Sequence, residues 1–212
     1  MICWLKKIFK NENIQTTTSP ETIVDEMFQK TSNLDVISIK LGNDLLTFAD
    51  SILDVIMNKR HEIFDKTGFV FPLVHVIDDP NLQENEFIVE IFDQKVYNLF
   101  VIPTEDDILN NISAAIEYIY NNHLDKIFTN EIFEKYLESV REKNSWLVWS
   151  VTSVIPIPTI KSILLQLLNS GKSIKNQPYI FETIGNIVLV NGYNRYDKYT
   201  SNEILNTLIN KL

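Results

Sequence analysis

The sequence predicts an α+β fold, in which a small mixed sheet with helices is followed by an all-α helical part. Two observations carry this prediction. Up to Pro103, short stretches of alternating apolar residues follow one another between helical segments. Beyond Pro103, apolar residues recur only every three or four positions, which is the period of a buried helix face. We therefore expect a basic leader and linker over residues 1–18, an α+β part over 19–103 and a helical part over 104–212.

The α+β part is expected to open with a helix and a strand. Ser19, Pro20 and Glu21 suit a helix start, because serine caps the helix and proline occupies its first position. Residues 35–42, with the sequence Asp-Val-Ile-Ser-Ile-Lys-Leu-Gly, then alternate between apolar and polar side chains. This alternation predicts a half-buried strand.

A second helix and three more strands are expected next. Asp50 or Ser51 can cap the helix, and Gly68 is placed to end it. Asp93 and Gln94 supply a tight turn between the last two strands. The three strands are expected over residues 69–77, 86–92 and 95–102.

Three long apolar faces mark the helical part. Each face repeats at helical spacing, and Gly171 is placed to end the third helix. The faces are Ile108, Ile112, Ala115, Ile116 and Ile119; Ile132, Phe133, Tyr136, Leu137 and Val140; and Ile160, Ile163, Leu164, Leu167 and Leu168. Shorter helices are expected over residues 178–184 and 201–212. Residues 187–190 are expected to form a short strand or an extended connection.

The charge balance and the single cysteine limit the class of function. The formal net charge of −9 argues against nucleic acid as a partner, because phosphate binding needs clustered Lys and Arg. Cys3 excludes an intrachain disulfide and fits a reducing compartment. No apolar run approaches the roughly 20 residues of a membrane-spanning helix, and Lys6 and Lys7 interrupt any signal-peptide core. We therefore expect a cytoplasmic protein.

No residue pattern predicts an enzyme centre. His61, His75 and His123 lie far apart, and none has a second ligand at the spacing of a zinc site. Gly171-Lys172-Ser173 resembles the end of a phosphate-binding loop, but a leucine-rich helix precedes it where that loop requires a strand. The Gly-x-Ser-x-Gly elbow of hydrolases does not occur. We therefore expect no catalytic residue, no metal and no cofactor.

Carboxylates gather in one turn, which contains Asp78, Asp79, Glu84 and Glu86. Paired acids can transfer protons or bind a divalent cation, so a metal-dependent enzyme is one alternative function. Acids are also ordinary turn residues, and a second alternative is that these four only build the turn. As an acidic surface, the turn is in addition a candidate for binding a protein partner.

Two other segments are candidate contact surfaces. Trp146 and Trp149 lie three apart among apolar residues, a pattern more typical of core or interdomain packing than of a ligand platform, and both are kept as candidate protein-binding residues. The leader can form a short amphipathic helix at a membrane surface or remain a disordered tail. The first alternative makes the chain a peripheral membrane protein, whose candidate membrane contacts are Trp4, Lys6, Lys7 and Lys10.

Three blocks of the sequence follow one another in the order and spacing of a known family. The blocks are the strand Asp35–Gly42, the segment Arg60–Phe92 with its Gly68-Phe-Val-Phe-Pro72 motif, and the segment Leu124–Glu182 with Gly171. Together they resemble the cytoplasmic domain of the FHIPEP family, the large export-gate proteins of flagellar and virulence type III secretion systems. The resemblance implies a reduced form that lacks the family's membrane domain, the small subdomain inserted after the hairpin, and the C-terminal subdomain.

The resemblance also implies a function. In the family, this cytoplasmic domain assembles as a ring and receives export substrates, partly at the junction with the inserted subdomain. Because that insertion is missing here, the resemblance assigns no docking residue to this sequence. It implies a non-enzymatic protein-binding or scaffold protein in the bacterial cytoplasm or at the inner face of the membrane. Its expected partners are components of a secretion apparatus or further copies of the chain.

Overall fold

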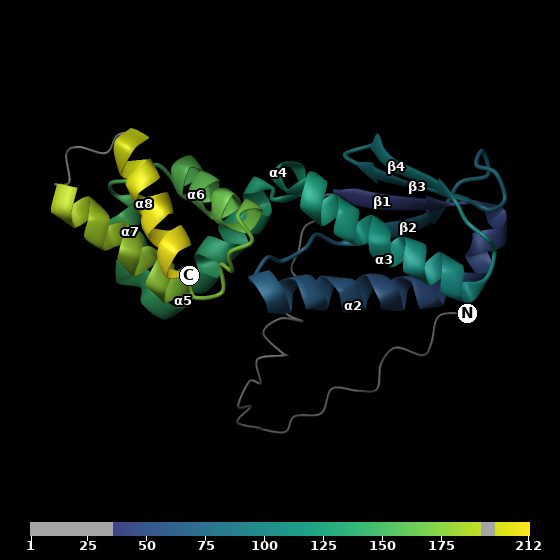
Figure 1. Ribbon diagram of the computed structural model, residues 1–212, viewed down its shortest axis with the longest axis horizontal. Helices are drawn as coiled ribbons and strands as arrows, with labels where there is room; N and C mark the ends of the chain where they lie inside the picture. Colours follow the sequence, from purple (N-terminus) through teal and green to yellow (C-terminus); the bar gives the residue numbers. More distant parts are fainter. Residues whose placement is uncertain (1–35, 192–197) are drawn as a thin grey trace, which may run out of the picture.

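A computed structural model of the chain describes residues 36–191 and 198–212 (Figure 1). The predicted leader and linker over residues 1–18, with Trp4, Lys6, Lys7 and Lys10, therefore lie outside the described residues, as does the helix expected from Ser19. The described chain forms one small sheet with helices, followed by helices alone, which confirms the predicted α+β class.

The sheet is four-stranded and mixed, with the order β2-β1-β3-β4. Strand β1 (Ile37–Leu41) runs parallel to β2 (Val74–Asp78) and antiparallel to β3 (Glu86–Ile91), which pairs with β4 (Gln94–Phe100). The predicted alternation in β1 is confirmed, because every second residue, beginning with Ile37, is buried. Helices α2 and α3 lie side by side along one face of the sheet (Figure 1).

The hairpin between β3 and β4 turns one residue earlier than predicted. Phe92 and Asp93 have φ values of 49° and 59°, and Gln94 already pairs with Ile91 as the first residue of β4. Two consecutive positive φ angles are those of a type I′ turn, which matches the right-handed twist of the strands. The prediction of Asp93 and Gln94 as the turn is therefore wrong, because Phe92 adopts a backbone conformation that its side chain does not favour.

Helix α2 (Ala49–Thr67) begins before its predicted cap. A 3-10 helix over Asn43–Phe48 leads directly into it, so that Phe48 takes the capping position in place of Asp50 or Ser51. Its end is as predicted, because Gly68 has a φ of 77° and its N–H donates to Phe64 O at 2.7 Å.

The strand expected from residue 69 begins only at Val74. Most of the preceding segment is buried, and Arg60 contacts its backbone. The Arg60 Nε and Nη2 atoms donate to the carbonyl oxygen of Phe71 at 3.2 and 3.1 Å, and Pro72 has no N–H to offer a neighbouring strand. The Arg60 side chain thus occupies the Phe71 carbonyl oxygen, which would otherwise be free to accept a hydrogen bond from a neighbouring strand.

The helical part follows β4 through only a few residues. Its elements are α3 (Glu105–Asn122), α4 (Leu124–Ile127), α5 (Asn130–Thr152), α6 (Ile157–Asn169), α7 (Gln177–Asn191) and α8 (Lys198–Lys211). All three predicted apolar faces are buried, in α3, α5 and α6. The strand or extended connection expected over residues 187–190 is wrong, since these residues continue α7. The buried residues Ile180, Ile184 and Val188 recur every fourth position, which is a helical period.

Helix α3 packs along α2 beneath the sheet, although the predicted division places it in the helical part. The division itself stays a prediction. No single described helix is long and apolar enough to cross a membrane, although α5 and α6 pass that test as a pair bent by 111°.

The segment after α6 ties the two parts together. The N–H of Ile174 donates to Thr67 O at 2.7 Å, at the end of α2. On its other side, the hydroxyl of Tyr136 in α5 donates to Ile174 O at 3.0 Å. Phe69 and Phe133 both contact Phe128, with ring centroids 5.5 and 6.1 Å away. An aromatic cluster and one clamped peptide thus join the helices to the sheet.

Replacing Tyr136 with phenylalanine is expected to lower the free energy of unfolding by about 1–2 kcal/mol, because the buried Ile174 carbonyl loses its donor. The ring and its packing are retained. Urea denaturation measures the change, with Tyr118→Phe as the control because that ring is 40% exposed and its loss should be close to neutral. Equal stabilities for the two variants would contradict the clamp.

Candidate functional site

The acidic turn is fixed to the end of β1 by three backbone hydrogen bonds. The N–H of Asp79 donates to Leu41 O at 3.0 Å, that of Gly42 to Glu86 O at 2.8 Å, and that of Asp44 to Glu84 O at 2.9 Å. The loop between β2 and β3 is therefore held against the start of the 3-10 helix. This places the predicted carboxylates on one end of the sheet.

The four carboxylates of the turn divide into two pairs. Asp79 accepts hydrogen bonds from the backbone and side-chain nitrogens of Asn81, and Glu86 accepts from Gln83 N and Asn98 Nδ2. These hydrogen bonds stabilise the charged forms and lower the pKa of both carboxyl groups. By contrast, Asp78 and Glu84 are exposed. Two of the predicted binding residues thus build the turn, and two are available at its surface.

The acidic turn offers little to a metal-dependent enzyme. Two of its carboxylates are occupied by the loop itself. Within residues 36–191 and 198–212, no group of three His, Cys, Asp or Glu side chains is placed to hold a metal ion. The arrangement is that of an acidic surface on a rigid loop.

The stability of the chain should fall as the pH is lowered below about 4.5, in part through Glu86. The pKa of Glu86 in the folded chain is below its ordinary value of 4.5, first because of the hydrogen bond from Gln83 N. Its contribution is therefore present above pH 4.5 and is lost as the pH falls through the folded pKa. Thermal unfolding of Glu86→Gln between pH 6 and pH 3 should show a weaker pH dependence than the parent, and an unchanged dependence would contradict this role.

Trp146 and Trp149 form an exposed apolar surface on α5. Their exposed fractions are 72% and 66%, so the interpretation as core or interdomain packing is wrong for both. Helix α5 has a break at Asn144, where φ is −145° and ψ is 61°. After the break, the helix buries Val148 and Val151, and the two tryptophans lie off that face. Such exposed pairs of large aromatic side chains are typical of contact surfaces.

A second exposed apolar group lies beside the acidic turn and was not predicted. Phe100 and Ile102 have exposed fractions of 51% and 65% at the end of β4. Phe100 pairs with Glu86 across the sheet, and Val101 exchanges hydrogen bonds with Asn85. The alternation of β4 contained the signal, because Phe100 shares the outward face with Asn98. The structure thus brings an apolar group to the acidic turn, whereas the tryptophans lie on another part of the chain.

These observations define a class: an α+β domain fused to a helical part, with exposed aromatic and acidic surfaces. No protein-family model matches the chain. The flagellar biosynthesis protein FlhA of Bacillus subtilis is 24% identical over 217 aligned positions, which cover 78% of this chain and 31% of FlhA. The chain therefore spans about a third of the length of this curated relative.

Solved structures share the fold over most of the chain. The Chlamydia pneumoniae CdsV protein matches with a TM-score of 0.67 at 16% identity, over 83% of this chain and 66% of CdsV. The nonameric SctV-C of EPEC matches with a TM-score of 0.70 at 12% identity, over 86% of this chain and 68% of SctV-C. The chain thus shares the fold of CdsV and SctV-C and is similar in sequence to a flagellar biosynthesis protein, which supports the resemblance found in the sequence.

Proposed function

We propose that this chain is a protein-binding scaffold in a type III or flagellar secretion apparatus and that it catalyses no reaction. The observation that carries the proposal is the shared fold with CdsV and SctV-C over more than four fifths of the chain. The sequence similarity to a flagellar biosynthesis protein supports the same class of function. The acidic turn supports no competing activity, because Asp79 and Glu86 are engaged in building it.

We propose that Trp146 and Trp149 are the principal contact residues. Tryptophan is enriched in the residues that dominate binding energy, because it buries a large area with little loss of side-chain entropy. Both side chains project from a helix that is anchored by its own buried face. Asp78 and Glu84 are the proposed secondary contacts, at the exposed side of the acidic turn.

The proposed partners are components of the secretion apparatus and further copies of the chain, in the cytoplasm at the inner face of the membrane. CdsV has been solved in complex with a second protein, CdsO, and SctV-C as a nonamer, so proteins of this fold bind other proteins and copies of themselves. Self-association is tested by sedimentation of the 24.7 kDa chain over a range of concentrations. If the chain stays monomeric at every concentration, further copies of the chain are excluded as partners.

Site-specific crosslinking in the native cells tests the contact surface. A photo-crosslinking amino acid is placed at Trp146, at Trp149 and, as a control, at Leu53, which is 43% exposed on α2. We expect the two tryptophan positions to capture a secretion-apparatus component or a second copy, identified by mass spectrometry, and the control to capture neither. The same products from all three positions, or no secretion component from any, would overturn the proposal.

A further inference from the structure

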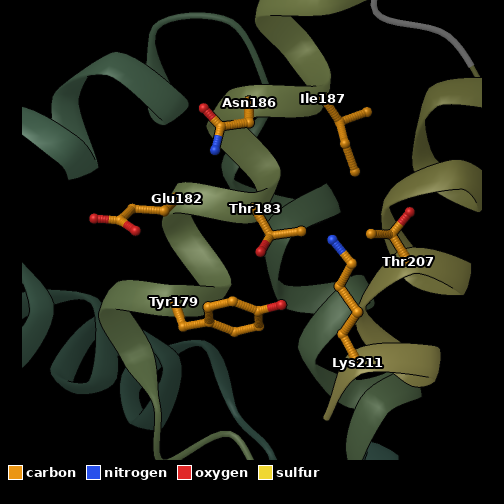
Figure 2. A pocket seen from close by; sticks show the side chains of 7 residues that line it. All are labelled: Tyr179, Glu182, Thr183, Asn186, Ile187, Thr207 and Lys211. Atoms are coloured by element: carbon orange, nitrogen blue, oxygen red, sulfur yellow. The ribbon is translucent and has the colours of Figure 1, made fainter.

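A half-open cavity of about 180 Å³ lies between helices α7 and α8 (Figure 2). The two helices are joined beside it by an apolar seam, in which Ile184 and Val188 of α7 and Ile204 and Leu208 of α8 are buried. The residues that line it include Tyr179, Thr183, Asn186 and Ile187 of α7, with Thr207 and Lys211 of α8. The cavity is thus a built feature of the packed helix pair.

Two polar groups reach into the cavity, one from each helix. Figure 2 shows the Lys211 amine directed toward Thr183, and the Tyr179 hydroxyl directed toward the stem of Lys211. Thr183 and Thr207 turn their methyl groups toward the lysine amine and their hydroxyls away from it, so both add apolar surface to the cavity (Figure 2). The tyrosine hydroxyl can donate one hydrogen bond, and the lysine supplies three further donors with a positive charge.

The charge of the lining is unbalanced at this point. Within the described part of the chain, no ion pair reaches Lys211. Glu182 lines the rim, but Figure 2 shows its carboxylate directed away from the lysine. An anion that enters beside Lys211 therefore gains the ammonium charge without displacing a carboxylate of the protein.

We propose that this cavity binds a carboxylate carried on a short apolar stem. Lys211 and the Tyr179 hydroxyl hold the carboxylate, while Ile187 and the methyl groups of Thr183 and Thr207 contact the stem. A water molecule takes up about 30 Å³ in the liquid, so the cavity has room for a group the size of butyrate or of a glutamate side chain. The carboxylate can belong to a free small acid or to an acidic side chain of a protein. This site is independent of the proposed contact residues on α5.

Chemical-shift titration of the isotope-labelled full chain tests the proposal. The probes are butyrate, neutral butyramide, cationic butylammonium, and an end-blocked Ala-Glu-Ala peptide. We expect butyrate or the peptide to shift the amide signals of Thr183, Thr207 and Lys211 saturably at millimolar concentration, and butyramide to bind roughly tenfold more weakly. Binding by butyrate alone assigns a free acid, and binding by the peptide assigns a protein side chain.

Three single substitutions test whether binding depends on the charges in and around the cavity. Lys211→Met keeps the stem but removes the charge, and should weaken binding roughly tenfold. Glu182→Gln removes the negative charge at the rim and should strengthen binding about twofold. Lys126→Met, at an exposed lysine on α4, should change nothing. Absence of saturable shifts, a preference for butylammonium, or equal binding by Lys211→Met and the parent would overturn the proposal.

Discussion

Replacing Gly42 with alanine should destabilise the fold by about 3 kcal/mol or more. A Cβ atom at this position would lie 2.0 Å from Gln83 O and 2.7 Å from Glu84 O, both of which are backbone atoms. Its φ of −71° is open to any residue, so the cost is steric only. Relief requires the β2–β3 loop to move away, which stretches the hydrogen bonds from Gly42 N and Asp44 N.

The control for Gly42 is the glycine with the opposite properties. Gly171 has a φ of 70°, but a Cβ atom there meets nothing within 4 Å. Gly171→Ala should therefore cost only the roughly 1–2 kcal/mol of a left-handed alanine. Urea denaturation of both variants measures the difference, and the prediction is wrong if Gly42→Ala is the milder of the two. Because the loop carries Glu84 and follows directly on Asp78, Gly42→Ala should also alter the acidic surface.

Replacing Arg60 with alanine should lower the free energy of unfolding by about 4 kcal/mol. The side chain is 1% exposed, and its guanidinium donates twice to the carbonyl oxygen of Phe71. Burial lowers the pKa of Arg60 to about 10, so the group remains charged at neutral pH. The substitution leaves a large cavity beneath α2 and removes both donors from a buried acceptor.

Two further substitutions separate the causes at Arg60. Arg60→Lys keeps a charge but loses the planar fork, and should fall between the parent and Arg60→Ala. Lys59→Ala, at the adjacent position, removes surface ion pairs with Glu62 and Glu117 and should cost at most about 1 kcal/mol. The free energies of unfolding of these variants can be compared directly if their denaturation curves have equal slopes. A cost for Arg60→Ala no larger than that for Lys59→Ala would contradict the buried role.

The apolar periods of the sequence predicted the elements well. The faces expected in α3, α5 and α6 are all buried, because a repeat of three or four residues can bury its apolar side chains only as a helix. The same rule applies to residues 187–190, which continue the helical repeat that begins at Ile180. The prediction treated them instead as a separate short apolar run. Periodicity alone does not distinguish a strand from the end of a buried helix.

The candidate site was predicted less completely than the fold. The sequence located the acidic residues of the turn, but it could not show that Asp79 and Glu86 are engaged by Asn81, Gln83 and Asn98. It favoured packing for Trp146 and Trp149, since neither the break at Asn144 nor the direction of the second half of α5 is encoded in a local pattern. Phe100 differs from the tryptophans, because the alternation of β4 places it on the outward face.

The sequence by itself determined the order of the elements, the buried faces and the family resemblance, because each of these depends on residues close together in the chain. Only the tertiary structure decided which side chains remain at the surface. Arg60 is buried because the segment around Phe71 crosses it, and Trp146 is exposed because none of the described elements crosses it. Burial depends on contacts between distant segments, and those contacts exist only once the chain has folded.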